Sequence, residues 1–533
     1  MQSNESVPAW AGALAGIVAG GVALGVAQLA SGLVRPEAFP VVAVGDVVVD
    51  LSPAPLKEFA IRTFGQNDKA VLVGGVFVVL GLLAAVIGVL ARRRTWYGLA
   101  GLAGFAVVGV TAVLSRPEAQ GVDVLPTLAG VGAGAWALVW LIGRARVAVP
   151  AEPVQQAVRD ESEAVERPAV MRAGREPMVF DRRRLLTGVA GGVAVAGAAT
   201  VLGRGLAGRR TVDAARIGVA LPRPASPLPA LPSGVDFKLN GLSSFVTRNQ
   251  DFYRVDTALV VPQVDPKTWT LRIHGLVDRP VEITYDDLLK RPLTEADVTL
   301  TCVSNEVGGP YVGNARWLGV RMADVLREAG LRSDADMLLS TSDDGFTCGT
   351  PLDVVMDGRD ALFAIAMNGE VLPVDHGFPV RQVVPGLYGY VSATKWVVDI
   401  KVTRFDTDEA YWTPRGWAAR GPIKTQSRID LPKPGATVTA GRTTIAGVAW
   451  AQHTGVSAVE VRVDRGEWRQ ARLAQVPGPD TWRQWALDWD ATPGDHTIEV
   501  RATDVAGRTQ TEDRTPIAPD GATGWHTITV EAA

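Results

Sequence analysis

The chain has few of the residues that usually carry metal, haem or disulfide chemistry. Its 533 residues include 2 cysteines and 5 histidines. Two cysteines are too few for a disulfide framework, so burial and hydrogen bonds must stabilise the fold. An excess of one charge is also missing, because 53 basic residues stand against 56 acidic ones. A nucleic-acid-binding protein would show a basic excess, so we expect no nucleic acid as a partner.

The histidines are unevenly placed along the chain. They are His274, His376, His453, His496 and His526, so residues 1–273 contain none. A haem held between two histidines inside a membrane needs those ligands on membrane helices. The apolar runs described next all lie before residue 273, so we expect no haem in this chain.

Long apolar runs are plentiful in the first part of the chain. A helix of about 20 apolar residues crosses the hydrocarbon core of a bilayer. Five runs of this kind are rich in glycine and alanine, which is typical of closely packed membrane helices. They predict an N-terminal α-helical membrane bundle with five spans, near residues 10–34, 70–91, 96–114, 124–142 and 185–202.

Arginines at the ends of these runs predict their orientation, because basic residues in short flanking segments stay in the cytoplasm. Arginines follow the second run at 92–94 and the fourth at 144 and 146, and precede the fifth at 182–184. Arg35 and Lys69 obey the rule less well, since they fall in the loop predicted to be outside. The pattern predicts a multi-pass protein of the cell (plasma) membrane, with everything after the fifth run outside the cytoplasm.

The fifth run begins with paired arginines. Arg182, Arg183 and Arg184 are followed by Leu185 and Leu186 and a weakly apolar stretch, which resembles a twin-arginine export signal. An ordinary anchor with flanking arginines is the alternative. Ala194-Val195-Ala196 resembles a signal-peptidase site but lies inside the apolar run, so we expect a retained anchor.

In the rest of the chain the pattern of apolar and polar residues changes twice. Strand-like segments mix with one amphipathic helix, Arg321–Ala329, and then short alternating strands dominate from about residue 429, as in a β-sandwich. The predicted domains are a four-helix transmembrane region (1–143), a cytoplasmic linker (144–181), the fifth helix (182–207), an extended tether (208–234), a first folded domain (235–428) and a terminal sandwich (429–533).

One segment carries the strongest chemical signal. Thr301-Cys302-Val303-Ser304-Asn305-Glu306-Val307-Gly308-Gly309 places a cysteine where an apolar strand meets a polar, glycine-rich turn. A thiolate at a strand exit suits a transition metal. From composition alone, a buried structural cysteine is the better interpretation, and a disulfide between Cys302 and Cys348 is a second alternative.

Several ordered blocks resemble the sulfite oxidase family of molybdopterin-dependent oxidoreductases. The Cys302 block continues as Gly313-Asn314-Ala315-Arg316-Trp317. The other blocks are Phe245–Asn249 with Asp251–Arg254, Val264–Trp269, His376–Arg381 with Val384-Pro385-Gly386, and Thr394-Lys395-Trp396. The resemblance implies an α+β sulfite-oxidase-type molybdopterin domain at 235–428 and a C-terminal all-β immunoglobulin-like domain that mediates dimerisation.

The resemblance also implies a cofactor and its ligands. In this family a molybdenum-molybdopterin cofactor binds the enzyme, and a protein cysteine completes the sulfur ligands of the metal. Carried over by motif, Cys302 is the metal ligand, and Arg248 and Tyr253 are catalytic residues. The implied cofactor-binding residues are Asn249, Tyr253, Ser342, Asp344, His376, Arg381 and Lys395.

Two positions depart from the family pattern. Val307 stands where the family has a substrate-binding arginine, and Trp417 where it has a tyrosine. Loss of a charged anchor weakens binding of a small dianion such as sulfite. We therefore expect oxygen-atom transfer with a larger or neutral substrate, such as sulfoxide reduction. The alternatives are a sulfite dehydrogenase or oxidase, and a non-catalytic membrane binding protein that keeps the fold.

The resemblance sets expectations for export and partners as well. This cofactor is inserted in the cytoplasm, so the domain must cross the membrane folded, which favours the twin-arginine interpretation. The expected partners are the lipid bilayer, a separate redox protein or quinone, a small-molecule or protein-bound oxygen donor or acceptor, and a second copy of the chain through the sandwich.

Overall fold

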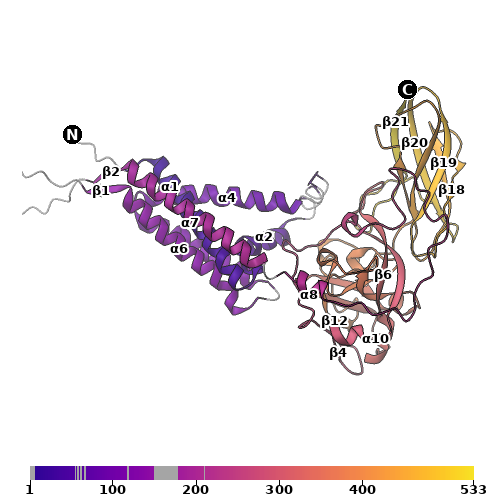
Figure 1. Ribbon diagram of the computed structural model, residues 1–533, viewed down its shortest axis with the longest axis horizontal. Helices are drawn as coiled ribbons and strands as arrows, with labels where there is room; N and C mark the ends of the chain where they lie inside the picture. Colours follow the sequence, from indigo (N-terminus) through magenta and orange to yellow (C-terminus); the bar gives the residue numbers. More distant parts are fainter. Residues whose placement is uncertain are drawn as a thin grey trace, which may run out of the picture. The chain divides into compact units, whose positions relative to one another are not determined.

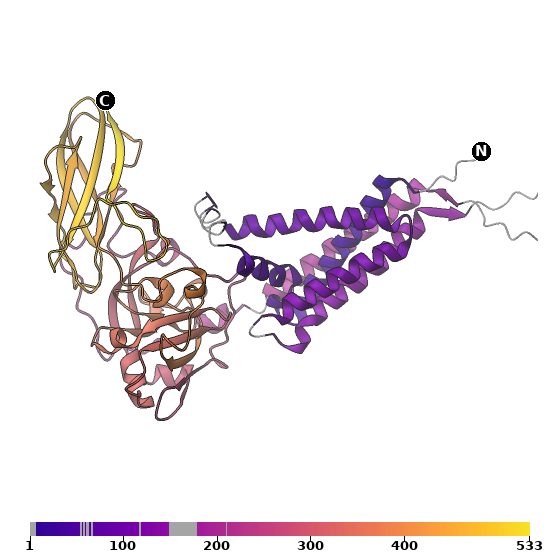
Figure 2. The ribbon, with the colours of Figure 1, turned by 180° about the vertical axis from the view of Figure 1, so that it is seen from behind.

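The computed structural model describes residues 7–53, 56, 59, 63–64, 68–116, 119–148, 178–208 and 211–533. It divides into two compact units, Met1–Thr211 and Val212–Ala533 (Figures 1 and 2). Most of the predicted cytoplasmic linker, residues 149–177, lies outside the described residues.

Long apolar helices make up the first unit. Within the part of the chain that the structure describes, five helices are long and apolar enough to cross a membrane. The helices of this unit are α1 (Ala9–Leu33), α2 (Pro40–Leu51), α4 (Asp68–Ala91), α5 (Thr95–Leu114), α6 (Leu125–Arg144) and α7 (Arg182–Gly208), with short 3-10 turns η1 (Pro36–Ala38) and η3 (Gly121–Val124). Strands β1 (Arg146–Ala148) and β2 (Met178–Phe180) pair where the predicted linker begins and ends.

Small residues allow these helices to approach closely. A Cβ added at Gly16 would lie 2.0 Å from the carbonyl oxygen of Ala84, and one at Gly203 would lie 2.5 Å from that of Gln28. Helix α1 therefore packs with backbone contact against α4 and α7, the geometry that glycine and alanine permit between membrane helices. Helix α2 was not predicted, because its 12 residues are too few for a span.

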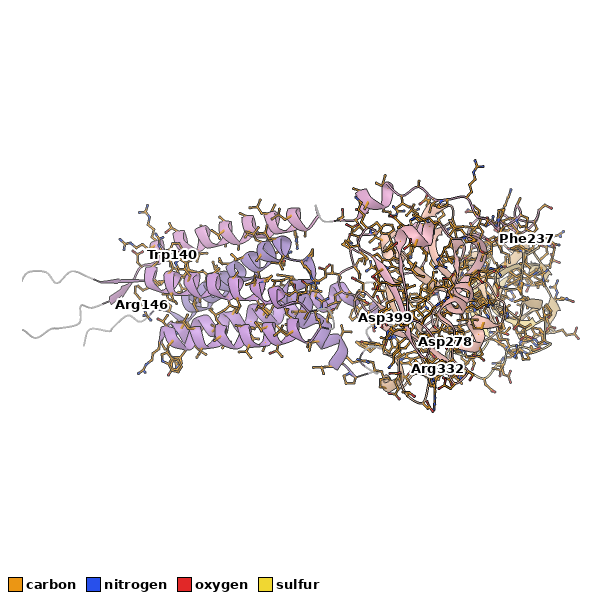
Figure 3. The ribbon with its side chains drawn as sticks, turned by 90° about the horizontal axis from the view of Figure 1, so that it is seen from below. Trp140, Arg146, Phe237, Asp278, Arg332 and Asp399 are labelled. Carbon is orange, nitrogen blue, oxygen red and sulfur yellow. The ribbon has the colours of Figure 1, made fainter. Side chains whose placement is uncertain are left out.

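Basic residues gather at one end of the helical unit. Trp140 and Arg146 lie together at this end (Figure 3). The guanidinium of Arg146 donates to the Arg92 carbonyl oxygen at 2.6 Å, and that of Arg144 lies 4.7 Å from the Trp140 ring. Arg182 begins α7 directly after β2, which pairs with the strand holding Arg146. The arginines that predicted the orientation thus belong to one end of the bundle.

The second unit begins with a docked segment rather than the predicted free tether. Within 208–234, α8 (Asp213–Ile217) is helical, and the Arg216 guanidinium donates to the carbonyl oxygens of Val371 and Leu372. Further on, Ser226 forms a parallel bridge with Thr294. The proline-rich composition suggested an extended chain, but partners on the folded domain bind it.

Two five-stranded sheets build the first domain of this unit. One has the order β10-β9-β6-β5 with β11 on β9, and the other β4-β3-β12-β7-β8. The strands are β3 (Thr270–Gly275), β4 (Val281–Thr284), β5 (Thr294–Thr301), β6 (Val312–Arg321), β7 (Met337–Ser342), β8 (Thr347–Pro351), β9 (Leu362–Met367), β10 (Glu370–Val371), β11 (Arg381–Val383) and β12 (Val397–Thr403). The helices are α9 (Tyr285–Leu289), α10 (Met322–Ala329) and α11 (Leu352–Met356), with 3-10 turns η4 (Asn249–Asp251), η5 (Val374–His376), η6 (Gly389–Val391) and η7 (Thr413–Arg415). Helix α10 confirms the predicted amphipathic helix.

Both faces of the first sheet are covered. One core, which includes Val320 and Phe363, packs toward the second sheet and α10, while another, which includes Val298 and Trp317, covers the opposite face. Strand β5 is therefore buried along almost its whole length. The strand alternates apolar Ala296, Val298 and Leu300 with polar residues. Its buried polar side chains therefore need internal partners, as Thr299 has in Asn314 at 2.9 Å.

The last domain is the predicted β-sandwich. Its sheets have the orders β13-β15-β19-β18 and β14-β21-β20-β16-β17, and their strands are yellow in Figure 1. The strands are β13 (Gln426–Leu431), β14 (Thr437–Val438), β15 (Gly441–Trp450), β16 (Val456–Val463), β17 (Arg469–Gln470), β18 (Arg472–Leu473), β19 (Arg483–Ala491), β20 (Gly494–Asp504) and β21 (His526–Ala532). Trp485 and Trp489 lie in its core, as expected.

Candidate active site

Cys302 lies directly after β5, at the exit of a buried strand. Its backbone N–H donates to the Tyr311 carbonyl oxygen at 3.0 Å, and its Sγ accepts from the Ser304 N–H at 3.4 Å. The Asn305 side chain closes the same loop, because its Oδ1 accepts from the Tyr311 N–H at 2.7 Å. We call residues 302–311 the cysteine loop. It holds the thiol in one position between two strands of the first sheet.

The thiol of Cys302 is free and buried, with 8% of the residue exposed. Burial raises the pKa of this thiol, against a smaller lowering by the Ser304 N–H. The group is therefore a neutral thiol in the metal-free protein, and binding a cation would deprotonate it. Cys348 is also a free thiol, so the two cysteines do not form the disulfide considered as an alternative.

Arg381 is a buried cation without an acidic partner. Its guanidinium donates to the carbonyl oxygens of His376 and Gln382 and lies 5.0 Å from the centre of the Trp317 ring. Among the described residues, no carboxylate forms an ion pair with it. Burial lowers the pKa of Arg381 to about 10, so it stays charged at neutral pH. A buried charge of this kind is costly unless an anion compensates it, which indicates an anion site.

Lys395 lies nearby but has an internal partner. Its Nζ is 2.6 Å from Asp256 Oδ2 and donates to the Asp375 carbonyl oxygen at 3.1 Å. Burial lowers the pKa of Lys395 to about 8, against the opposing effect of Asp256. The structure therefore already neutralises much of this charge, and Arg381 is the stronger anion ligand of the two.

A glycine brings these two cations together. Gly377 has φ +109°, and an added Cβ would lie 3.0 Å from the Cβ atoms of both Arg381 and Lys395. A side chain at this position would both strain the backbone and separate the cations.

His376 and Asn249 tie two distant blocks of the sequence together. His376 Nε2 lies 2.9 Å from the Asn249 carbonyl oxygen, so Nε2 carries the hydrogen and Nδ1 is the free acceptor. Burial lowers the pKa of His376 to about 4, which keeps the ring neutral. The Asn249 amide donates to the Met367 carbonyl oxygen at 3.2 Å and accepts from Asn368 at 2.8 Å. Both side chains are thus occupied in positioning the loops.

Tyr253 lies next to the cysteine loop, and the charge of Arg381 affects the pKa of its hydroxyl. Burial, helped by the nearby Cys302, raises the pKa of its hydroxyl far above the ordinary value, while Arg381 acts in the opposite direction. The Tyr253 ring lies beside that of Tyr311, the last residue of the cysteine loop, with 6.3 Å between the ring centres. Its ring stacks on Phe252 at 5.2 Å. The hydroxyl therefore stays protonated at any physiological pH and can donate a hydrogen bond.

Ser342 and Asp344 lie at the end of β7. The Ser342 Oγ is buried and makes no hydrogen bond within the described protein. Asp344 Oδ1 accepts from the Phe346 N–H at 3.2 Å in the turn that follows. An orphaned buried hydroxyl is costly, so the Ser342 Oγ is a site where a bound group would supply the missing partner.

Arg248 is not gathered with the other predicted residues. Its side chain is 73% exposed and pairs with Asp251 in the same turn. The structure brings together Cys302, Tyr253, Arg381, Lys395, His376 and Asn249, but it leaves Arg248 at the surface.

Three neighbours were missed from the sequence. Asp256 pairs with Lys395, Trp317 lies against Arg381, and the charge of Arg381 acts on the pKa of Cys348. Asp256 follows the Asp251–Arg254 block by two residues, so extending that block would have found it. No local signal distinguishes Cys348, which lies inside strand β8.

An apolar cluster replaces the expected anion contacts beside the cysteine loop. Val303 and Val307 of this loop belong to one cluster with Trp417, Tyr388 and Ile517. The two positions that depart from the family pattern, Val307 and Trp417, therefore share one apolar environment, and neither carries a charge.

Comparison with known proteins supports the motif assignment. The model of the oxidoreductase molybdopterin binding domain matches residues 258–412, and that of a bacterial Ig domain matches residues 426–500. Mouse mitochondrial sulfite oxidase is 34% identical over 292 residues, which cover 46% of this chain and 53% of the relative. The uncharacterized oxidoreductase YuiH of Bacillus subtilis is 35% identical over 162 residues, which cover 30% of this chain and 78% of YuiH.

Among solved structures, the sulfane dehydrogenase SoxCD from Paracoccus pantotrophus aligns with a TM-score of 0.48 at 25% identity, over 54% of this chain and 82% of that one. The chain spans about half the length of the mammalian relatives it matches.

Proposed function

Because this chain belongs to the sulfite oxidase family of molybdopterin-dependent oxidoreductases, we propose that it is a membrane-anchored, extracytoplasmic enzyme that transfers an oxygen atom to or from a sulfur-containing substrate. Its cofactor is molybdenum-molybdopterin, as the matched domain and the sulfite oxidase relatives imply. The direction that the site favours is reduction of a sulfoxide. The observation that carries this proposal is the apolar cluster beside Cys302.

The residues present fit the cofactor. Arg381 is a buried cation that lacks an acidic partner among the described residues, which suits the cofactor's phosphate. The orphaned Ser342 Oγ offers a polar contact for the pterin. Cys302 would supply a thiolate to the metal, and His376, Lys395, Asn249 and Asp344 would line or support the binding loops. When bound, the group supplies the two-electron redox centre for oxygen transfer.

Tyr253 has the role of a hydrogen-bond donor in this proposal. Its raised pKa keeps the hydroxyl protonated, and its place beside the cysteine loop would let it donate to an oxygen atom at the centre. A fixed donor in a buried site stabilises developing negative charge without reorganisation of water. The exposed Arg248 has no such position in this structure, so its contribution would require its side chain to turn inward.

The apolar cluster favours a neutral substrate. A dianion such as sulfite needs cationic side chains to bind it in the site. Charge-assisted hydrogen bonds are about twice as strong as neutral ones. Val307 supplies no such bond, and it packs instead against the apolar cluster that contains Trp417. An apolar wall suits the organic groups of a sulfoxide, in which only one polar oxygen needs a donor.

The helical unit supports the membrane part of the proposal. Five helices of sufficient length and apolarity precede the catalytic unit, and arginines gather at one end of the bundle. By the positive-inside rule this end faces the cytoplasm, so the chain after α7 lies outside. We propose twin-arginine export through Arg182 and Arg183, electron exchange with a separate redox protein or quinone, and pairing of two chains through the sandwich.

The substrate is tested by comparing two reactions of the purified full-length protein, loaded with cofactor, in detergent. We expect reduction of methionine sulfoxide with a reduced viologen dye, and much weaker oxidation of sulfite with ferricyanide. Val307→Arg should lower the KM for sulfite by about tenfold, because it restores one charge-assisted contact. Glu306→Gln is the matched control, since it changes the net charge by the same one unit at an exposed neighbouring position.

Two results would contradict the proposal. Efficient sulfite oxidation without sulfoxide turnover would support a sulfite dehydrogenase. Absence of molybdenum from protein made in a host that synthesises the cofactor would support the non-catalytic binding protein.

A further inference from the structure

The cysteine loop makes its contacts not only with its own domain but also with the C-terminal sandwich. Arg428, on β13 of the sandwich, donates from Nη1 to the Gly309 carbonyl oxygen at 2.9 Å. Its Nε bonds Asp430 at 2.7 Å, and its Nη2 bonds Ser243 Oγ at 2.9 Å. All three sides of this buried guanidinium are therefore used, and one of them holds the far part of the loop.

A second sandwich residue, His526, packs against the backbone of the loop. Gly308 has φ +79°, and an added Cβ would lie 2.2 Å from Cδ2 of the His526 ring. His526, the first residue of β21, is itself held by the Ile429 N–H, which donates to its Nδ1 at 2.9 Å. The glycine backbone therefore rests directly on an imidazole that a neighbouring strand keeps in position.

The strand that leads into Cys302 is held in the same way. Gln452 of the sandwich donates from Nε2 to the Thr299 carbonyl oxygen at 3.1 Å and to Thr301 Oγ1 at 2.9 Å. The Trp482 N–H donates to Thr299 Oγ1 at 2.7 Å. Thr301 directly precedes Cys302, so the sandwich binds the backbone on both sides of the cysteine.

We propose that the C-terminal sandwich positions Cys302, with Arg428 and Gln452 as positioning residues, in addition to any role in pairing two chains. A metal ligand keeps its orientation only when the groups around it are fixed by neighbouring contacts. The cysteine loop has backbone contacts to its own sheet at its two ends, while Gly308 and Gly309 contact the sandwich. The positioning role rests on the proposed function of Cys302 as the metal ligand. The contacts between the loop and the sandwich are observed whatever that function is.

The test compares Arg428→Met with Arg501→Met in the full-length protein. Arg501 is a matched control, because it is a partly buried sandwich arginine that contacts Glu460 and Trp468, which both belong to the sandwich. Hydrogen exchange of the amides in residues 302–311 is measured in the cofactor-free protein. We expect Arg428→Met to speed exchange there about tenfold, and Arg501→Met to leave it unchanged.

The loaded protein provides a second readout. Electron paramagnetic resonance of the molybdenum should show an altered or heterogeneous signal in Arg428→Met and the wild-type signal in Arg501→Met, with the same oligomeric state by sedimentation. Where Arg428→Met fails to fold, Gln452→Met replaces it, with the exchange expected at Thr301 and Cys302.

Unchanged exchange and an unchanged spectrum in the folded Arg428 or Gln452 variant would overturn the inference. A different result is possible if the wild-type protein binds no molybdenum. Faster exchange in the Arg428 variant would then support the positioning of the loop, while the missing metal would overturn the proposed function. The two failures are therefore distinguishable.

Discussion

The helical unit and the C-terminal unit differ in what their side chains can do. Residues 1–211 contain no cysteine and no histidine, and their helices meet through glycine and alanine. The C-terminal unit contains both cysteines, all five histidines and the buried cations Arg381 and Lys395. The first unit has the composition of an anchor and the second the groups needed for redox chemistry. The difference motivates the proposal that electrons pass to or from a separate redox protein or a quinone.

The largest effect is expected when the one proposed metal ligand of the C-terminal unit is removed. Cys302→Ser should lower turnover more than about 100-fold and abolish molybdenum binding, because even supporting groups around a metal typically cost 10- to 100-fold. Cys348→Ser is the control, since it removes the other buried thiol of the same unit. Elemental mass spectrometry and turnover measure both. Full metal content in Cys302→Ser would refute the ligand assignment.

The second prediction concerns the proposed export of the catalytic unit across the membrane. Replacing Arg182 and Arg183 by lysine preserves the positive charge but removes the paired arginines. We expect the catalytic unit to remain in the cytoplasm, because only a pathway for folded proteins can move it with cofactor bound. Protease added to spheroplasts should digest the wild-type domain and spare the variant. Equal digestion would show an ordinary anchor.

A smaller effect is expected at the anion site. Arg381→Lys keeps the charge but loses the planar fork, so cofactor retention should fall about tenfold. Arg316→Lys is the matched control, because Arg316 lies on β6 and already has an acidic partner in Asp297. Cofactor content after gel filtration is the measurement. Equal retention in both variants would mean that the cofactor's phosphate binds elsewhere.

The smallest effect is a difference in acid sensitivity. Burial lowers the pKa of His526 to about 4, below its value of about 6.5 in the unfolded chain. The unfolded state therefore takes up the proton first, so stability is complete above pH 6.5 and is lost as the pH falls toward 4.

Between pH 7 and pH 5 the loss is about 2 kcal/mol for this one group. Urea unfolding followed by tryptophan fluorescence should show a smaller loss in His526→Gln than in wild type. A loss of the same size in both proteins would count against a buried, neutral His526.

The sequence predicted the chemistry of the site better than the positions of its side chains. The Thr301–Gly309 block and the His376–Arg381 block identified the family, and the strand before Cys302 was predicted correctly. Arg248 fell in an equally good block, yet its side chain is exposed. A motif specifies which residue type stands at a position, but the direction of a side chain depends on contacts with residues far away in the chain.

The sequence by itself determined the five apolar helices, the family, the cofactor class and the terminal sandwich, because composition and short ordered motifs suffice for these. Only the tertiary structure decided that residues 212–234 dock on the domain and that Lys395 is paired with Asp256. It also decided that Arg428 contacts the cysteine loop and that Gln452 contacts the strand before it. The contacts of Lys395, Arg428 and Gln452 join residues that are more than a hundred positions apart. Local patterns carry no information about such pairs, because the partners meet only when sheets pack against each other.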